Sequence, residues 1–274
     1  MRNVLITGAN TGIGLATAEA LAERGDRIWL ANRSAEKTRA VVLELARRYP
    51  KARIEGLSLD LADLASVRAC AARFEAAHEP LHVLIANAGL AGQRGATKQG
   101  FELAFGTNHL GHFLLTQGLL PALLRANGAR VVVVASRAHY RAKSLDLTAL
   151  RQPTATYTGI AEYGVSKLAN VLFAKELARR FEGKGISTYA LHPGVVRSDI
   201  WRRIPWPIRA LATWHMITNE EGAKTSLHCA NEPGLDGKSG LYWDKCEERM
   251  PSELAQRRDL AEELWTRSEE WTRE

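Results

Sequence analysis

Short apolar runs alternate with longer helical segments along almost the whole chain, and this rhythm constrains the fold more than any other feature. The apolar runs are continuous, as expected for strands that are covered on both faces. They lie at residues 4–7, 27–31, 54–58, 83–86, 131–135 and 186–191, and helices are expected at 12–24, 35–49, 64–78, 101–120 and 161–181. This order predicts an α/β fold, a doubly wound parallel sheet with helices on both faces.

The end of the chain departs from this rhythm. Residues 198–218 hold Trp201, Trp206 and Trp214 among prolines and arginines, which indicates an irregular helical flap rather than a linker. A helix from residue 220, a short strand at 241–243 and a charged helix at 252–274 are expected to follow. Pro121 is expected to end or kink the fourth helix. The whole stretch 1–274 is therefore interpreted as one domain with about seven strands.

Composition excludes several classes of protein. The net charge is +7, but no run of Lys and Arg reaches five residues, so no nucleic-acid partner is expected. The three cysteines show no metal-ligand spacing, which predicts reduced thiols and no metal site. The first strand begins too early for a signal peptide, and no apolar run reaches the roughly 18 residues of a membrane span. We therefore expect a cytoplasmic protein with no integral membrane segment.

A glycine-rich turn joins the first strand to the first helix. It reads Thr7-Gly8-Ala9-Asn10-Thr11-Gly12-Ile13-Gly14. Glycines let the backbone approach a pyrophosphate, and the helix N-terminus offers N–H groups and positive dipole charge. The spacing is not GxGxxG, and a purely structural turn is the alternative. The turn predicts a dinucleotide site and makes the expected fold Rossmann-type.

The second and third strands refine the expected dinucleotide. Where an NAD site usually carries an acid, this chain has Asn32 followed by Arg33, and a guanidinium can grip a 2′-phosphate. The expected cofactor is therefore NADP(H) rather than NAD(H), with a merely solvated Arg33 as the alternative. Asp60 and Leu61 follow the third strand, and Asp60 can either cap the next helix or accept from an adenine amino group.

Tyr163 and Lys167 carry the expected chemistry. Their spacing of four residues places them on one face of a helix. An ammonium beside a phenol lowers the pKa of the phenol, which makes it a general acid or base for a carbonyl or an alcohol. Ser136 ends a buried strand, where its hydroxyl can bond a substrate oxygen or simply start a turn.

Other residues fall at the same expected edge of the sheet. Asn87-Ala88-Gly89 follows the fourth strand, and His192-Pro193-Gly194 follows the sixth. Asn108 lies inside an apolar helical segment, where a buried amide often marks a kink or a bound water. His109 and His112 are interpreted as packed or surface side chains rather than metal ligands, because no third ligand is placed.

This ordered set of motifs resembles the short-chain dehydrogenases/reductases over nearly the whole chain. The narrower likeness is to their retinol dehydrogenase-like branch, through the glycine turn, Tyr163-Gly164-Val165-Ser166-Lys167 and His192-Pro193-Gly194-Val195. The long interval between Ser136 and Tyr163 is also similar. Microsomal members of that branch carry an N-terminal anchor, for which this sequence shows no segment.

The resemblance implies a role for each residue. Tyr163 is the proton donor or acceptor, Lys167 lowers its pKa and bonds the nicotinamide ribose, and Ser136 orients the carbonyl. Asn108 kinks its helix and holds a relay water. The implied contacts to the dinucleotide come from Gly8, Asn10, Thr11, Gly12, Ile13, Gly14, Arg33, Asp60, Leu61, Asn87, Ala88, Gly89, Tyr163, Lys167, Pro193, Gly194, Val195 and Ser198.

The leading hypothesis is an NADP(H)-dependent oxidoreductase acting on an apolar aldehyde, ketone, retinoid-like or steroid-like compound. Two alternatives stay open: a non-catalytic nucleotide sensor or scaffold, and a light-dependent tetrapyrrole reductase. The flap is expected to cover the substrate, with contact to a membrane surface as the alternative. A homodimer through the fourth and fifth helices is the assembly that the resemblance implies.

Overall fold

The computed structural model describes residues 1–195, 217–235 and 237–273 of the chain. One eight-stranded sheet runs through it in the order β3-β2-β1-β4-β5-β6-β7-β8. Its strands are β1 (Asn3–Thr7), β2 (Arg27–Asn32), β3 (Arg53–Ser58), β4 (Val83–Ala86), β5 (Ala129–Val134), β6 (Ile186–His192), β7 (Tyr242–Asp244) and β8 (Glu247–Arg249). The first seven are parallel to their neighbours, and only β8 pairs antiparallel. The predicted Rossmann-type parallel sheet is confirmed.

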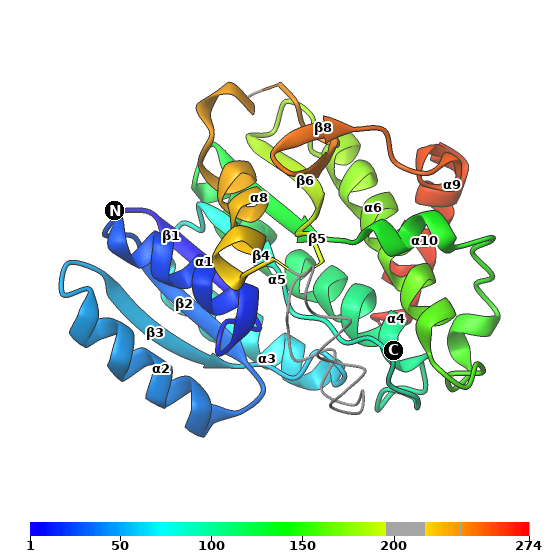
Figure 1. Ribbon diagram of the computed structural model, residues 1–274, viewed down its shortest axis with the longest axis horizontal. Helices are drawn as coiled ribbons and strands as arrows, with labels where there is room; N and C mark the ends of the chain where they lie inside the picture. The colour runs from blue at the N-terminus through cyan, green and yellow to red at the C-terminus, as the bar shows by residue number, and fades with distance from the viewer. Residues whose placement is uncertain (196–216, 236, 274) are drawn as a thin grey trace.

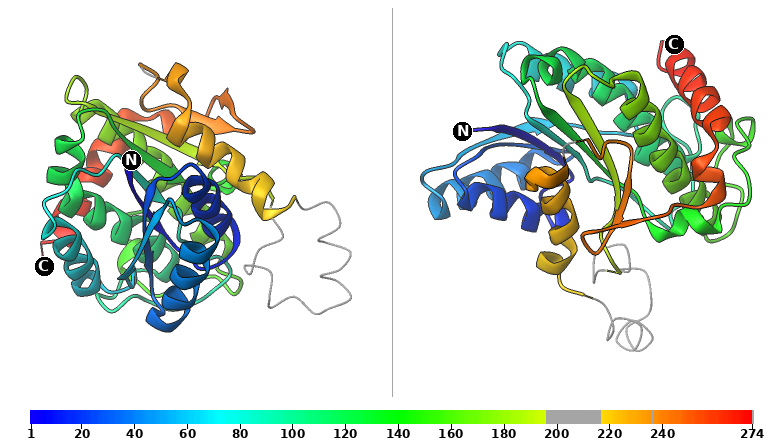
Figure 2. Two further views of the ribbon diagram at one scale, coloured as in Figure 1. Left: turned by 90° about the vertical axis from the view of Figure 1, so that its left-hand side faces the viewer. Right: turned by 90° about the horizontal axis from the view of Figure 1, so that it is seen from above.

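Helices cover both faces of the sheet, as the views in Figures 1 and 2 show. On one face lie α1 (Gly12–Glu23), α2 (Ala35–Arg48) and α8 (Asn219–Asn231). On the other lie α3 (Leu64–Glu75), α5 (Gly111–Arg125) and α6 (Ile160–Arg180), with α9 (Glu253–Gln256) and α10 (Arg258–Trp271) outside them. Within the described ranges, no helix combines the length and the apolarity needed to cross a bilayer.

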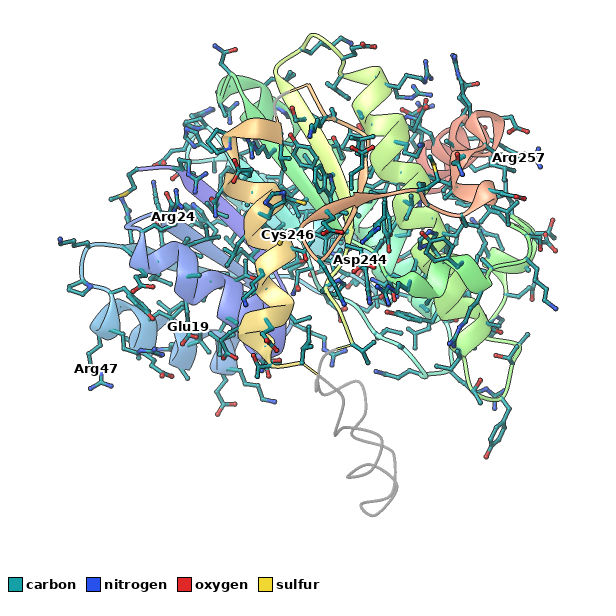
Figure 3. All side chains as sticks on the ribbon, turned by 45° about the horizontal axis from the view of Figure 1, so that its top comes forward. Glu19, Arg24, Arg47, Asp244, Cys246 and Arg257 are labelled. Atoms are coloured by element: carbon teal, nitrogen blue, oxygen red, sulfur yellow. The ribbon has the colours of Figure 1, made fainter. Side chains whose placement is uncertain are left out.

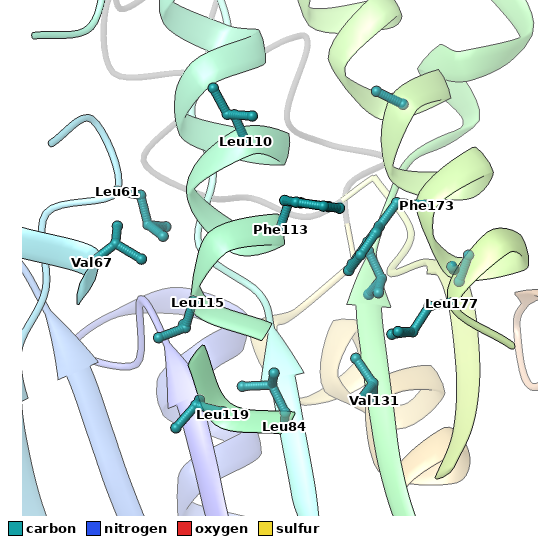
Figure 4. Close-up of a cluster of buried hydrophobic side chains, with 14 of the residues drawn as sticks. Leu61, Val67, Leu84, Leu110, Phe113, Leu115, Leu119, Val131, Phe173 and Leu177 are labelled. Carbon is teal, nitrogen blue, oxygen red and sulfur yellow. The ribbon is translucent and has the colours of Figure 1, made fainter. Parts of the chain in front are cut away.

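Two apolar cores follow from the alternation of side chains along the buried strands. Val4 and Ile6 of β1 point into the core under α1 and α8, whereas Leu5 points into the core under α3, α5 and α6. Figure 4 shows part of this second core, where Phe113 of α5 and Phe173 of α6 lie over Leu84 and Val131 of the sheet. Because both faces are covered, the central strands β1, β4, β5 and β6 are buried at nearly every position, whereas the edge strand β3 alternates buried with more exposed residues.

The helix predicted at 101–120 is built differently from the expectation. It consists of α4 (Leu103–Phe105), a π-helical segment η1 (Gly106–Leu110) and α5, which continues to Arg125. Pro121 therefore does not end the helix. The following amide, that of Ala122, donates to the Glu75 carboxylate at 2.9 Å, so a partner from α3 supports the backbone beside the proline. The irregularity falls at the π segment instead.

The C-terminal part was predicted only in outline. The strand expected at 241–243 is β7, and a two-residue turn at Lys245 and Cys246 leads into β8, which the sequence did not predict. Both turn residues have a positive φ, 53° and 60°, as a hairpin of this length requires. Helix α8 begins with a capping box between Thr218 and Glu221. Most of the predicted flap, with its three tryptophans, lies outside the described residues.

Helix α10 completes the aromatic part of the core. Trp265 contacts Phe113 edge-on, with ring centroids 5.0 Å apart, and stacks on Phe173 at 6.0 Å. Trp271 contacts Phe101 and Phe105, at 5.4 and 5.9 Å. The last helix of the chain is thus packed onto the elements that carry Asn108 and Tyr163.

Candidate active site

The carboxyl ends of the central strands gather most of the residues that the sequence singled out. Thr7 ends β1, Asn87 follows β4, Ser136 follows β5 and Pro193 follows β6. The strand order turns back between β1 and β4, so the loops after these two strands diverge and leave room for a ligand between them.

The glycine turn has the geometry of a phosphate cradle. Gly8 and Gly12 have a positive φ, of 67° and 61°. A Cβ on Gly12 would meet only the Asn219 side-chain oxygen, at 3.9 Å, so the backbone there is open to a ligand. The Thr11 side chain does not cap α1, and no acid lies in its first turn. The N–H groups and the dipole of α1 are therefore suited to an anion, and the turn fits a pyrophosphate.

Asn87 and Thr7 hold this turn against the end of β4. The Asn87 amide donates to the carbonyls of Thr7 and Gly8, at 2.9 and 3.3 Å. The Thr7 hydroxyl accepts the backbone N–H groups of Asn87 and Ala88, at 3.0 and 2.9 Å. A Cβ on Gly14 would lie 2.4 Å from the Gly8 carbonyl oxygen, so only glycine fits where α1 passes the turn.

The end of β2 lacks an acid and presents a cation. Asn32 is buried, and its side-chain oxygen accepts the N–H of Ala9 at 2.7 Å, so this residue ties the end of β2 to the glycine turn. Its side-chain nitrogen is buried and has no partner among the described residues. Arg33 is exposed beside it. The end of β2 therefore offers an exposed cation with no acid before it.

Asp60 does not cap the following helix. The N-cap of α3 is Asp63, whose carboxylate accepts the N–H of Ala65 at 3.1 Å. The Asp60 carboxylate instead accepts the N–H of Ala62 at 3.0 Å through one oxygen. Leu61 is buried against α5, where its carbonyl lies 2.5 Å from the place of a Cβ on Gly111. Of the two readings of Asp60, the cap is wrong.

Tyr163, Ser136 and Lys167 come together at the end of β5. The Ser136 hydroxyl lies near enough to the Tyr163 hydroxyl to lower the pKa of the phenol by hydrogen bonding. The Lys167 Nζ lies 5.6 Å from the centre of the Tyr163 ring and donates to the carbonyl of Val134 at 2.8 Å. Ser136 also accepts the N–H of Ala138 at 3.1 Å, so it starts a turn as well.

The electrostatics of the pair differ from the expectation. Burial raises the pKa of Tyr163, and the hydrogen bond from Ser136 opposes that rise only in part. Burial also lowers the pKa of Lys167 to about 7. The predicted lowering of the tyrosine pKa by Lys167 is thus not the dominant effect in this structure, because the Lys167 ammonium is itself desolvated and bonds a backbone carbonyl.

Asn108 lies in the π segment and is fully buried. Its side-chain oxygen accepts the N–H of Leu90 at 2.9 Å, and its nitrogen donates to the Leu90 carbonyl and to the Ser166 hydroxyl, both at 2.9 Å. A Cβ on Gly89 would lie 3.2 Å from the Asn108 oxygen and 3.5 Å from the Lys167 Nζ, so the Asn87-Ala88-Gly89 segment passes closely over both side chains.

The loop after β6 completes the edge as far as Val195. Gly194 has a φ of 96°, and a Cβ there would lie 2.3 Å from the Ile217 side chain. The Val195 carbonyl accepts the N–H of Ile217 at 3.1 Å, so the residue that precedes the predicted flap by three positions is bonded to the end of the flap. Ser198 lies outside the described residues.

Two residues that the sequence did not suggest lie beside Ser136. The Arg137 guanidinium donates to the buried Asp244 carboxylate at 2.6 Å, which links the end of β5 to the end of β7 across β6. Asp244 is labelled at the β7 end in Figure 3. A cavity of about 290 Å³ lies here, lined by Arg137, Tyr140, Asp244, Lys245, Arg249 and Met250. No sequence signal pointed to this pair, because β7 is short and its register was unknown.

Comparison with known proteins agrees with this geometry. The family described as "short chain dehydrogenase" matches residues 2–147. Retinol dehydrogenase 12 of Mus musculus is 43% identical over 96% of this chain and 83% of its own length. Retinol dehydrogenase 11 of Homo sapiens is 42% identical, with the same coverage of both chains.

Solved structures are similar throughout. A protein from Mycobacterium Paratuberculosis has a TM-score of 0.80 and 34% identity, covering 100% of this chain and 94% of its own. The Pseudomonas aeruginosa RhlG/NADP active-site complex has a TM-score of 0.72 and 26% identity, covering 89% and 94%. With a family match over more than half of the sequence and relatives spanning nearly all of it, this chain belongs to the short-chain dehydrogenase/reductase family and is retinol dehydrogenase-like.

Proposed function

We propose that this protein is an NADP(H)-dependent oxidoreductase that transfers a hydride between a nicotinamide and the carbonyl or alcohol of an apolar substrate. The observation that carries the proposal is the position of the Lys167 Nζ, which is buried 5.6 Å from the centre of the Tyr163 ring and bonded to the carbonyl of Val134 at the end of β5, two residues before Ser136. The nicotinamide, when bound, supplies or accepts the hydride. The remaining steps belong to side chains of this chain.

Tyr163 moves the proton in this proposal. Because burial raises its pKa, the hydroxyl stays protonated at neutral pH, as donation to a carbonyl oxygen requires. Ser136 donates to the same oxygen and orients it. Lys167 is fixed by its bond to the Val134 carbonyl, and Asn108 is fixed by its two bonds to the backbone of Leu90. In the direction of alcohol oxidation, Tyr163 must instead accept a proton, and the buried Lys167 amine is the group that can stabilise the phenolate.

The test compares two tyrosines. We expect Tyr163→Phe to abolish NADPH consumption with a panel of aldehydes and ketones. The control is Tyr157→Phe, since Tyr157 is 88% exposed. Equal, measurable rates for wild type and Tyr163→Phe would remove Tyr163 from the mechanism. Absence of NADPH consumption by the wild-type protein would favour the non-catalytic nucleotide sensor.

The dinucleotide is assigned to the glycine turn and its neighbours. The proposed contacts are those of Gly8, Asn10, Thr11, Gly12, Ile13, Gly14, Arg33, Asp60, Leu61, Asn87, Ala88, Gly89, Pro193, Gly194, Val195 and Ser198. The preference for NADP(H) rests on Arg33, which is exposed at the end of β2 with no acid at the preceding position.

Cofactor choice is tested by reversing one charge. Arg33→Asp should weaken NADPH binding far more than NADH binding, because the carboxylate repels a 2′-phosphate. The matched control is Arg47→Asp, in the last turn of α2, where the side chain lies on the outer surface (Figure 3). If Arg33→Asp changes the affinities for both dinucleotides alike, the assignment of Arg33 is wrong.

An apolar substrate is proposed from the relatives, which are named retinol dehydrogenases. The cavity beside Arg137 is lined by four charged side chains, those of Arg137, Asp244, Lys245 and Arg249. We therefore do not assign the apolar substrate to it and keep the tryptophans of segment 198–218 as the proposed apolar walls. A panel that pairs retinal and long-chain aldehydes with short polar aldehydes tests this: kcat/KM should rise with apolar length. A flat profile would refute it.

Assembly as a homodimer through the fourth and fifth predicted helices stays a prediction. Part of this surface is already covered within the chain, since α10 packs against α6 and α5 through Trp265. Light scattering on the purified protein measures the assembly directly.

A further inference from the structure

His112 lies in the first turn of α5, one turn after Asn108, and both of its ring nitrogens are bonded. Its side chain is 1% exposed. The Nε2 atom lies 2.8 Å from the Thr7 hydroxyl oxygen, and the Nδ1 atom lies 2.9 Å from the backbone carbonyl oxygen of Asn108. One imidazole ring therefore spans from the glycine turn to the helix that carries Asn108.

The protonation of the ring follows from counting donors. A hydroxyl has one hydrogen to donate and two lone pairs to accept with. Both lone pairs of the Thr7 hydroxyl are used by the N–H groups of Asn87 and Ala88. The Thr7 hydrogen must therefore point to His112, whose Nε2 accepts it. The ring proton is then on Nδ1, where it donates to the Asn108 carbonyl.

The neighbouring bonds extend this bridge to the proposed catalytic tyrosine. The Asn108 amide donates to the Ser166 hydroxyl, and the Ser166 hydroxyl donates to the Tyr163 carbonyl at 2.8 Å. At the other end, the Thr7 hydroxyl fixes the start of the Asn87-Ala88-Gly89 segment. The π segment between Gly106 and Leu110 is closed by the Gly111 N–H, which donates to the Gly106 carbonyl rather than to Thr107. A π-type bond thus replaces the α-helical one at this point, and the His112 ring is a further partner of the Asn108 carbonyl.

We propose that His112, as the neutral Nδ1–H tautomer, is a positioning residue that holds the Asn108 backbone in register with the dinucleotide turn. It touches neither the substrate nor the reacting atoms. Through His112, the positions of Asn108, Ser166 and Tyr163 depend on the Thr7 hydroxyl, which also fixes the glycine turn that would hold the cofactor. The inference rests on the proposed function, because the catalytic group that it positions belongs to that function.

His109 supplies a matched control on the same segment. It is as deeply buried as His112, but its Nε2 lies 3.1 Å from the Ser268 hydroxyl of α10, and its ring packs among Phe105, Phe113 and Phe173. It therefore ties the π segment to the C-terminal helix and has no bond to the glycine turn. His109→Gln should lower stability while leaving kcat and dinucleotide affinity unchanged in the folded protein.

Two substitutions separate the two bonds of His112. In His112→Asn, the short amide can still donate to the Asn108 carbonyl but does not reach Thr7. In His112→Gln, the longer amide reaches the Thr7 hydroxyl with its oxygen and gives up the bond to Asn108. We expect His112→Asn to weaken NADPH binding, measured by quenching of tryptophan fluorescence. We expect His112→Gln to lower kcat by about tenfold or more with little change in NADPH affinity.

The outcomes decide the proposal. Unchanged kcat and unchanged NADPH affinity in both folded variants would overturn it. Changes in kcat and NADPH affinity equal to those measured for His109→Gln would overturn it as well. If the variants do not fold, long-range proton–nitrogen NMR on the wild-type protein still tests the tautomer: a protonated Nδ1 and an unprotonated Nε2 support it, and the reverse overturns it. If the wild-type protein reduces no carbonyl, the proposed function fails separately, while NADPH affinity and the tautomer still test His112.

Discussion

Mild acid should unfold this protein, because its core holds histidines in the neutral form. Burial lowers the pKa of His109 to about 3, and it lowers the pKa of His112 and of His192 to about 4 each. In an unfolded chain, a histidine titrates near pH 6.5. The unfolded state therefore binds more protons than the folded state between these values. The stability that these three histidines contribute is fully present above pH 6.5 and is lost as the pH falls toward their folded-state pKa values.

The magnitude follows from the gap between the two pKa values. At pH 5, each of these three histidines favours the unfolded chain by about 2 kcal/mol, so together they remove about 6 kcal/mol, as much as many domains possess. Carboxylates with lowered pKa values, such as that of Glu79, contribute their losses mainly below the usual range of carboxyl titration and do not account for this change.

Urea unfolding at pH 7.5, 6 and 5 measures the effect, with far-UV circular dichroism as the probe. The slope of unfolding free energy against pH should approach that of three protons and should fall by about one proton in His109→Gln. A free energy of unfolding that stays constant from pH 7.5 to 5 would show that these rings are solvated or already charged, and the reasoning on burial would be refuted.

Three further predictions concern packing and charge. Gly14→Ala should destabilise the protein by about 1–2 kcal/mol, because the clash of the added methyl with the Gly8 carbonyl costs more than the gain in helix propensity. This variant should also bind NADPH more weakly. The control is Gly118→Ala, whose methyl meets the Ala71 side chain on α3; calorimetry should show lower stability, with NADPH affinity intact. Arg27→Met should cost about 1–2 kcal/mol in urea unfolding, because the Arg27 side chain is buried between Glu55 and Glu79 whereas these carboxylates stay about a third exposed; no loss would mean that the ion pairs contribute nothing net. Trp265→Ala should cost about 3–5 kcal/mol and lower the melting temperature, since the buried indole packs against both Phe113 and Phe173. A small loss would show that α10 is only loosely attached.

The central strands β1, β4, β5 and β6 were predictable because most of their residues are apolar and buried. The starts of β4 and β6, the start of α1 and the start of α3 fall at the predicted residues. The terminal elements were harder, since β7 and β8 have three residues each and pair only through tertiary context. Pro121 misled because its missing N–H is tolerated where Glu75 of α3 supports the neighbouring amide.

At the site, residue types were easier to predict than partners. The sequence predicted that Tyr163 and Lys167 share a helix face, and the structure places the two side chains beside each other. It did not predict that burial would dominate both pKa values, because burial depends on what α6 packs against. Asp63 rather than Asp60 caps α3. The two acids are three residues apart, and the choice between them depends on the residue at which the helix starts. The sequence predicted His112 to be a packed or surface side chain. It gave no sign of the bonds of its ring to the Thr7 hydroxyl and the Asn108 carbonyl, because these depend on how α5 lies against β1.

The position of α10 has a consequence for synthesis of the chain. Phe101, Phe105 and Phe113 emerge from the ribosome early, whereas their partners Trp265 and Trp271 are made almost last. Until then a broad aromatic surface has no cover, which invites association with other nascent chains. Shortening the gene by its final helix would make that exposure permanent, so truncated products should collect in the insoluble fraction of a producing cell.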